Sequence, residues 1–271
     1  TGLAVGRQLQ HPLPYRERKR LARRMMVPDS PAARIARAKA YPFSPPRESY
    51  LFRAGKAEPL TDTAMQVRGR TPVLASGSNA APEQLARKYA AHGATAPIPV
   101  TRARVRDFDS VYNAHIAAYG SVPATLFPSP GTTLSTFITW LDDDALAVMH
   151  GTEQPGVNYH YAELSGIAVE ADGVGTFDAA FAYISVAGCL IRDGAPVALA
   201  EVSAAGRSFP ALTQIEALTL ARDLTAPDMD IDAFILETIA DEAQRLARGQ
   251  RLAATARAFA HPGYRVIALG G

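Results

Sequence analysis

The sequence has little of what several kinds of functional site require. Its 271 residues include a single cysteine, Cys189, which excludes an internal disulfide framework and any multi-cysteine zinc or iron–sulfur site. No stretch reaches the roughly 18 apolar residues that a membrane helix needs. No Walker A, G-x-G-x-x-G or G-x-S-x-G motif occurs, so the sequence supports neither a nucleotide-binding loop nor a serine nucleophile. With 48% hydrophobic and 20% charged residues, the chain is expected to be a soluble, cytoplasmic protein with no membrane partner.

Charge is distributed unevenly along the chain. Residues 1–70 hold 15 of the 28 Lys and Arg but only 5 of the 26 Asp and Glu, so the remainder is acidic. This asymmetry predicts a basic arm that folds back on its own acidic body, or that joins copies of the chain in a homo-oligomer. Binding of nucleic acid through residues 15–24 is a third possibility, but it is less expected, because the basic run Arg16–Arg24 has no interleaved aromatic residues on which bases could stack.

The pattern of turns and apolar runs predicts three parts. Residues 1–70 form the arm, with helices over 15–26 and 30–40, the second capped by Ser30, and a Pro-rich extended connection over 41–70. Residues 71–205 form the core, where strands are expected over 98–104, 110–118, 123–126 and 135–141, with a turn at 129–131. Residues 206–271 form a helical C-terminal extension, with helices expected over 212–224, 231–248 and 252–260. The fold class is α+β, with a mostly antiparallel, barrel-like sheet followed by helices.

Two segments of the core have features that favour chemistry. The loop Ser76–Asn79 lies between the apolar strand 72–75 and a helix over 81–89, which would direct backbone N–H groups at an anion; Asn79 could equally cap that helix. Glu153 is expected just past a helix over 142–149, on a loop before an aromatic-rich strand. There, partial desolvation would raise its pKa toward that of a general acid or base.

These segments resemble the gamma-glutamylcyclotransferase-like superfamily. The run Val73–Leu85 (VLASGSNAAPEQL) is similar to its opening signature, an apolar strand, Tyr-Gly-Ser-Asn and a helix, with Ser76 in place of the tyrosine. Three further segments follow in the family's order: Pro123–Thr132 (PATLFPSPGT), Phe137–Leu141 and Leu146–Glu153 (LAVMHGTE). The resemblance covers about residues 72–190.

The resemblance implies a small barrel with a pocket at one mouth and a cofactor-independent reaction. A gamma-glutamyl amine would attack its own side-chain carbonyl, releasing 5-oxoproline and an amine or amino acid, with Glu153 as the general acid and base. The residues expected to bind the substrate, a gamma-glutamyl compound or a related amide, are Ala75, Ser76, Gly77, Ser78, Asn79, Tyr159 and Tyr161. Tyr183 could supply the tyrosine that Ser76 replaces.

Other interpretations of the same residues remain open. The fold could serve as a non-catalytic module that binds a small metabolite, or it could cleave another amide. His150, Glu153 and His160 could offer zinc two nitrogens and a carboxylate, but Gly151 and Pro155 interrupt a continuous helix, so no metal is expected. Cys189 lies in an apolar run and is expected to be a buried packing residue.

Overall fold

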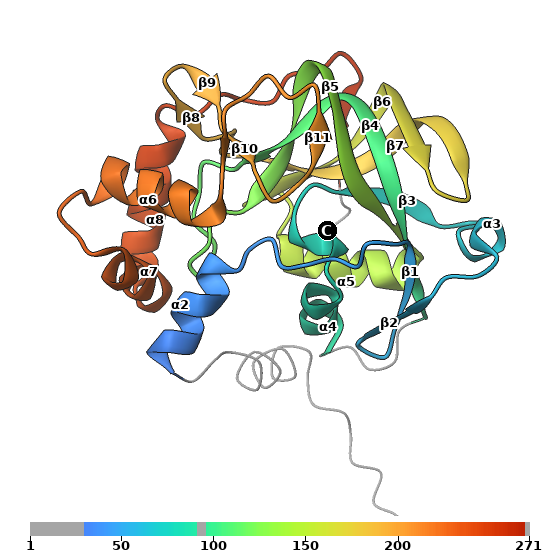
Figure 1. The fold of residues 1–271 in the computed structure, drawn as a ribbon, viewed down its shortest axis with the longest axis horizontal. Helices are drawn as coiled ribbons and strands as arrows, with labels where there is room; N and C mark the ends of the chain where they lie inside the picture. The colour runs from blue at the N-terminus through green and yellow to red at the C-terminus, as the bar shows by residue number, and fades with distance from the viewer. Residues whose placement is uncertain (1–29, 91–95, 269–271) are drawn as a thin grey trace, which may run out of the picture.

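Five strands close into a barrel in the computed structural model, which describes residues 30–90 and 96–268 (Figure 1). The barrel strands are β3 (Thr71–Ala75), β4 (Ile98–Tyr112), β5 (Ala124–Leu141), β6 (Tyr159–Ala171) and β7 (Gly175–Ser185). Their neighbours run β5-β3-β7-β6-β4, and β4 pairs with β5 to close the ring; β3 and β7 are parallel and the other pairs antiparallel. The predicted α+β class with a mostly antiparallel, barrel-like sheet is confirmed.

The two longest strands correct the sequence prediction. Four short strands were expected over 98–141, with a turn at 129–131, whereas β4 and β5 each run continuously through their segments. The pair bends where its register shifts between Arg106 and Phe108. Asp107 has a positive φ there, and its carboxylate accepts the backbone N–H of Gly131 at 2.7 Å. Residues typical of turns thus make an irregularity that curves long strands into a barrel.

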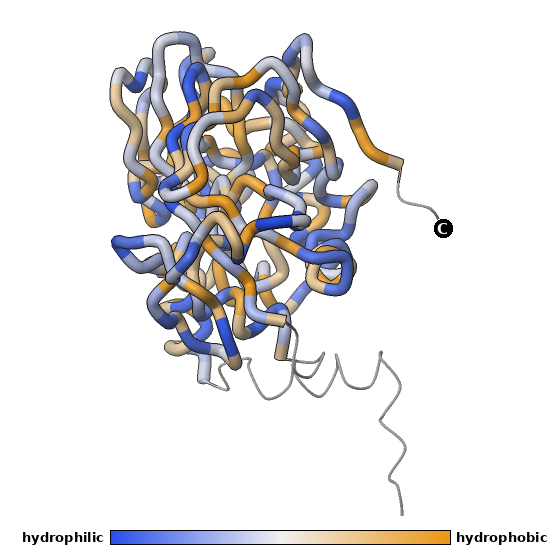
Figure 2. The backbone as a smooth tube through the Cα atoms, turned by 90° about the vertical axis from the view of Figure 1, so that its right-hand side faces the viewer, coloured by the Kyte–Doolittle hydropathy of each residue, from blue (hydrophilic) through white to orange (hydrophobic). Residues whose placement is uncertain are grey.

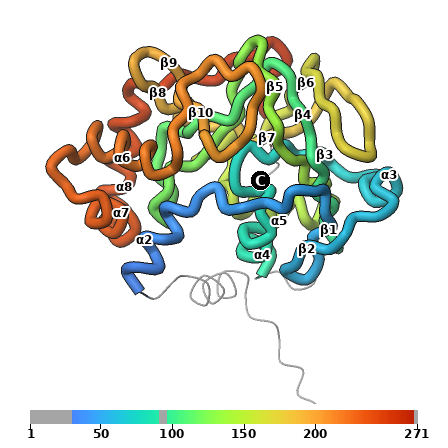
Figure 3. The backbone as a smooth tube through the Cα atoms, in the orientation of Figure 1, coloured from blue at the N-terminus to red at the C-terminus, as the bar shows by residue number. Residues whose placement is uncertain are grey.

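The N-terminal segment is more structured than an extended connection. Helix α2 (Pro31–Lys39) begins as predicted, with the Ser30 hydroxyl accepting the Ala33 N–H at 3.2 Å. The 41–70 stretch then crosses the front of the molecule (Figure 3) and adds β1 (Tyr50–Arg53) and β2 (Lys56–Pro59) to the sheet through β4, followed by α3 (Thr63–Gln66). The uninterrupted run of three apolar residues, Tyr50–Phe52, was the missed signal. The helix expected over 15–26 lies outside the described residues.

Two helices and a short 3-10 turn lie below the barrel. They are η1 (Ser78–Ala80), α4 (Pro82–Tyr89) and α5 (Asp143–Glu153). Asp142 caps α5 through the Ala145 N–H at 2.9 Å, and the left-handed Gln154 ends it. Glu153 is therefore the last residue of a helix, and the expected end at 149 was four residues too early.

The C-terminal part packs three helices against α2 and one end of the barrel (Figure 1). They are α6 (Gln214–Thr225), α7 (Ile231–Ala240) and α8 (Glu242–Ala253). The single helix expected over 231–248 breaks at Asp241, whose extended backbone and side-chain cap start α8. Most of the helix expected over 252–260 is absent. Short strands complete this part: β8 (Ile191–Arg192), β9 (Ala195–Pro196), β10 (Ala198–Leu199), β11 (Ala204–Ala205), β12 (Ala211–Leu212) and β13 (Tyr264–Val266).

Apolar side chains gather in three main places. One cluster, which includes Leu74, Leu134 and Ile184, fills the barrel. A second, including Leu85 and Met149, joins the barrel to α4 and α5, and a third joins α2 to the C-terminal helices. Apolar and hydrophilic stretches alternate along the chain (Figure 2), as expected for elements with one buried face. No helix among the described residues is long and apolar enough to cross a membrane.

Candidate active site

A pocket of about 700 Å³, here called the inner pocket, lies where the barrel end meets α2, α4, α5 and α8. Its walls come from segments far apart in sequence, including Tyr41, the loop 76–79, Tyr119 and Glu153. The N-terminal segment and α8 both lie outside the span that the family resemblance covers. The pocket is therefore completed by parts of the chain beyond the predicted core.

Glu153 is held in this pocket by two side chains from the opening segment of the core. Its Oε1 accepts a hydrogen bond from Asn79 Nδ2 at 3.0 Å and forms an ion pair with Lys88 of α4. The side chains of Lys88 and Glu153 are only 7% and 11% exposed. Lys88 also donates to the Thr152 hydroxyl at 3.0 Å. The carboxylate thus has a fixed position at the end of α5, with a buried cation beside it.

Two tyrosines enclose the glycine–serine loop. Tyr41 accepts the Ala124 N–H at 2.7 Å, and Tyr41 and Tyr119 line the pocket together with Ser78. A Cβ atom on Gly77 would lie 2.0 Å from the Tyr41 hydroxyl oxygen. Only glycine therefore permits this close approach. The tyrosine that meets the loop comes from the N-terminal segment, whereas the hydroxyl of Tyr183 is bonded to His150 at 2.8 Å.

The structure brings together most of the residues expected to bind substrate. Ser76, Gly77, Ser78, Asn79 and Tyr159 line the inner pocket with Glu153. Ala75 and Tyr161 are not part of its lining.

The two exceptions are buried in the fold. The carbonyl of Ala75 accepts the Thr136 hydroxyl at 2.5 Å within the barrel wall. Tyr161 stacks on Phe181 at 5.2 Å between ring centres and meets His150 edge-on at 4.6 Å. Of the two candidate aromatic residues, the geometry therefore favours Tyr159.

Burial controls the titration of the pocket's aromatic groups. Desolvation raises the pKa of Tyr41, Tyr119 and Tyr159 well above that of a free tyrosine, and the negative charge of Glu153 adds to the shift. Desolvation also lowers the pKa of His115 to about 4, although the Glu153 charge opposes this. His115 is therefore neutral near pH 7. Its Nδ1 is buried and has no hydrogen-bond partner within the described part of the chain.

The histidines do not assemble a metal site. Among residues 30–90 and 96–268, no group of three or more His, Cys, Asp or Glu side chains could hold a metal ion. Cys189 is fully buried, and burial raises the pKa of its thiol to about 11, as expected for a packing residue.

Several pocket residues were missed by the sequence analysis: Arg37, Tyr41, Arg87, Lys88 and His115. Lys88 alone left a signal. It lies three residues after the buried Leu85, on the apolar face of α4, where an unpaired lysine would be costly. The others depend on how the N-terminal segment and the loop after β4 fold back, which local sequence does not reveal.

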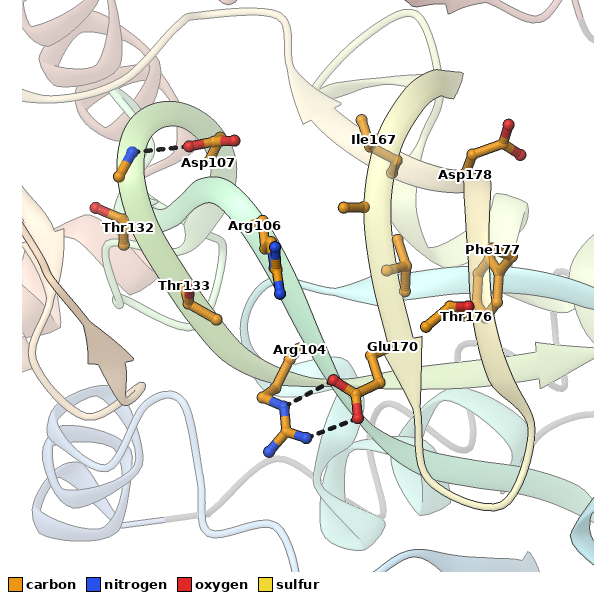
Figure 4. Close-up of a pocket in the computed structure, with 13 residues that line it drawn as sticks. Arg104, Arg106, Asp107, Thr132, Thr133, Ile167, Glu170, Thr176, Phe177 and Asp178 are labelled. Atoms are coloured by element: carbon orange, nitrogen blue, oxygen red, sulfur yellow. Dashed lines mark hydrogen bonds and ion pairs between the residues drawn. The ribbon is translucent and has the colours of Figure 1, made fainter.

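A second and larger hollow lies on the outside of the barrel (Figure 4). This outer hollow, about 890 Å³, is lined by residues of β4, β5, β6 and β7, among them Arg104, Asp107, Glu170 and Phe177. Arg104 and Glu170 face each other in two hydrogen bonds of 3.2 and 2.7 Å. Its charged side chains are exposed, and Arg104 and Glu170 are paired with each other.

No protein-family model and no curated protein matches the chain. Similar solved structures include a gamma-glutamyl cyclotransferase, 16% identical over 43% of this chain and 66% of that one, just under two thirds of its length, with a TM-score of 0.34. They also include a protein from Arabidopsis thaliana, 14% identical over 43% of this chain and 68% of that one, with a TM-score of 0.32. An uncharacterized human protein is 14% identical over 52% of this chain and 68% of that one, with a TM-score of 0.27.

Proposed function

We propose that the chain is a gamma-glutamylcyclotransferase-like enzyme that cleaves an amide-linked glutamyl compound and releases 5-oxoproline. One observation carries the proposal. The Gly-Ser-Asn loop and the downstream glutamate, the two motifs identified in the sequence, meet at the 3.0 Å hydrogen bond between Asn79 and Glu153 in one pocket. They are 74 residues apart in the chain. A pocket of about 700 Å³ is large enough for a dipeptide-sized ligand.

The reaction needs only positioning and proton transfer. The free amine of the glutamyl group attacks its own side-chain carbonyl carbon, a five-membered ring forms, and the bond from that carbon to the leaving nitrogen breaks. Glu153 accepts the proton that the attacking amine loses and delivers it to the leaving nitrogen. General acid–base catalysis of this kind contributes roughly 10²–10⁴-fold in rate, and holding the amine against the carbonyl contributes further.

The surrounding residues have supporting roles in this proposal. Lys88 and Asn79 hold the Glu153 carboxylate at a fixed place, which a proton-transfer group requires. The loop 76–79 and Tyr159 form the wall against which the glutamyl part lies. The tyrosines Tyr41 and Tyr119 bring apolar ring surface to this wall, so that water is displaced when the ligand enters. No cofactor is required for any of these steps.

The test is 5-oxoproline release from a panel of gamma-glutamyl dipeptides and amines, followed by mass spectrometry. Wild type and Glu153→Gln are compared, because glutamine keeps the size of the side chain and removes its ability to take up a proton. Release by wild type alone supports the proposal. Silence from both folded proteins contradicts it. Retained binding of panel compounds would then favour the non-catalytic binding module, and release of ammonia or an amine without 5-oxoproline would identify another amide cleavage.

A further inference from the structure

Two arginines in the inner pocket come from separate parts of the chain. Arg37 is on α2 in the N-terminal segment, and Arg87 is on α4, one residue before Lys88. Each guanidinium lies over an aromatic ring: Arg37 is 5.0 Å from the centre of Tyr119, and Arg87 is 5.3 Å from the centre of Phe43. The two rings are themselves 6.4 Å apart. The charged groups are therefore held in place by stacking, which keeps their hydrogen-bond donors free for another group.

Both guanidinium groups have a donor without an acceptor. Arg37 Nε and Arg87 Nη1 are buried, and neither has a hydrogen-bond partner within the described residues. Leaving a buried donor of a charged group unpaired is costly, so native structures rarely contain two in one pocket unless a ligand, an ion or ordered water satisfies them. Gln84, one turn before Arg87 on the same helix, has a buried amide oxygen that is also unpartnered there.

The charges around these donors leave an excess of positive charge. Arg87 forms an ion pair with Glu83, whose side chain is 56% exposed. Arg37 has no such ion pair among the described residues, and its pKa is lowered by burial and then by the charge of Arg87. The two cations are thus close enough to repel each other in a partly desolvated place. An anion bound between them would remove this repulsion.

We infer that Arg37 and Arg87 form an oxyanion-binding subsite that takes a carboxylate or phosphate group of the ligand. Both groups accept paired N–H donors from guanidinium, and Gln84 lies beside them to accept an N–H from the same ligand. The subsite gives the N-terminal segment a role in recognition, because α2 supplies half of it. If the amide that reacts lies beside Glu153, the anion bound by the two arginines belongs to the leaving part of the substrate. This assignment to the leaving part rests on the proposed function, whereas the existence of the subsite does not.

The first experiment measures anion binding without any reaction. Inorganic phosphate and malonate are titrated into wild type, Arg37→Gln, Arg87→Gln and Arg53→Gln at constant ionic strength, with binding followed by calorimetry. Arg53 is the matched control, because it is half exposed in the β1–β2 hairpin and pairs only weakly with Glu58 at 3.6 Å. We expect one or both anions to bind wild type and the control, and either pocket variant to lose about tenfold to a hundredfold in affinity. Whichever anion binds more tightly distinguishes the phosphate source from the carboxylate source.

Two outcomes would overturn the subsite: no binding of either anion to wild type, or unchanged affinity in Arg37→Gln. Since Arg37→Gln also removes a stacking contact, Arg37→Lys keeps the charge and the aliphatic stem but lacks the fork of donors. It should fold as wild type does and still bind less tightly, and wild-type affinity in this variant would also contradict the inference.

A second experiment connects the subsite to turnover. Gamma-glutamyl-alanine and gamma-glutamyl-ethylamine differ only by the carboxylate on the leaving part. If Arg37→Gln raises KM about tenfold or more for the first and leaves the second unchanged, the subsite recognises that carboxylate. Equal effects on both compounds would exclude this placement of the anion. If wild type turns over neither compound, the proposed function fails, and the anion titration still decides the subsite.

Discussion

The outer hollow and the inner pocket both contain arginine and glutamate, but the two sites differ in the burial and pairing of these charged side chains. In the outer hollow, arginine and glutamate are exposed, and Arg104 and Glu170 satisfy each other's hydrogen bonds. In the inner pocket, Lys88 and Glu153 are buried together, while Arg37, Arg87 and His115 carry buried polar atoms that nothing in the described chain satisfies. The outer hollow is larger, but its charges need no ligand.

This difference teaches where to expect chemistry. Burying polar groups costs free energy, so a fold keeps unsatisfied ones only where something else balances the cost. Exposed ion pairs contribute little either to stability or to binding. The size of a hollow is thus a weaker guide to function than the state of the polar atoms in its walls.

The sharpest way to break the comparison is to neutralise one glutamate in each hollow. Glu153→Gln is expected to lower the rate of 5-oxoproline release by about 10²-fold or more, because the proton acceptor is lost. Glu170→Gln should leave the rate unchanged, because Glu170 is exposed and outside the inner pocket. Both are measured with the best compound of the panel at saturating concentration. Comparable rates in the two variants would show that the inner pocket is not the site of reaction.

The second prediction compares what one cation in each hollow, Lys88 or Arg104, contributes to the stability of the fold. Lys88→Met leaves the buried Glu153 without its ion pair and should lower the free energy of unfolding by about 3–5 kcal/mol. In the double variant Lys88→Met, Glu153→Gln, most of this loss should be recovered, because no unpaired charge remains. Arg104→Met, in the exposed pair, should cause no measurable loss. Urea denaturation of the four proteins provides the free energies, and a loss that persists in the double variant would assign the effect of Lys88 to packing.

These comparisons also explain how far the sequence could lead. The loop 76–79 and Glu153 were predicted as candidate site residues from local sequence patterns and from the family resemblance. A turn-forming segment between an apolar strand and a helix can be recognised from a few consecutive residues. The α+β class followed from alternating apolar runs and late helices. Lys88 was missed although its place on the apolar face of α4 was readable.

The rest of the site depends on long-range packing. Tyr41 and Arg37 enter the pocket because α2 docks on two other parts of the fold. Lys39 bonds Asp232 of α7 at 2.5 Å, and the Ala38 carbonyl accepts the hydroxyl of Ser121, in the loop between β4 and β5, at 2.9 Å. Nothing in the composition of 30–49 indicates that contact. The prediction divided the long strands β4 and β5 into shorter ones, because Pro130 and Gly131 are typical of turns. In the structure both residues lie within β5, and its pairing with β4 keeps them in a continuous, bent strand. The domain boundaries at 70 and 205 stay predictions.

The third prediction compares how a titratable residue in each hollow makes the stability of the fold depend on pH. Unfolded histidine binds a proton near pH 6.5, whereas buried His115 does so only at about pH 4. Between these values the unfolded state carries more protons, so stability falls as the pH falls from 6.5 toward 4, by up to about 3 kcal/mol. Above pH 6.5 both states are neutral at this residue, and it contributes nothing to the pH dependence.

The variant His115→Asn should lack this loss, which urea denaturation at pH 7, 5.5 and 4.5 would measure. The outer hollow has no histidine in its lining. Its Glu170, whose pKa is lowered by hydrogen bonding to Arg104, stabilises the folded state above its unfolded pKa and loses that effect only at more acidic pH. Glu170→Gln should therefore match wild type between pH 7 and 5.5. A variant at His115 that keeps the wild-type slope would show that the ring is hydrated rather than buried.

The smallest effects come from one glycine in each hollow, and they distinguish two reasons for needing glycine. At Gly77 the reason is space, since a Cβ would lie 2.0 Å from the Tyr41 hydroxyl oxygen; at Gly131 it is the backbone, since φ is +81° and no atom lies within 4 Å of a Cβ. Either change to Ala should cost about 1–3 kcal/mol, by overpacking in the first case and by left-handed strain in the second. Tyr41→Phe removes the clashing oxygen and leaves contacts of 3.1 and 3.2 Å, so it should recover most of the loss from Gly77→Ala and none of the loss from Gly131→Ala. Double-mutant cycles of unfolding free energy measure this coupling, and equal coupling to both glycines would mean that Tyr41 supports the barrel as a whole rather than the loop of the inner pocket.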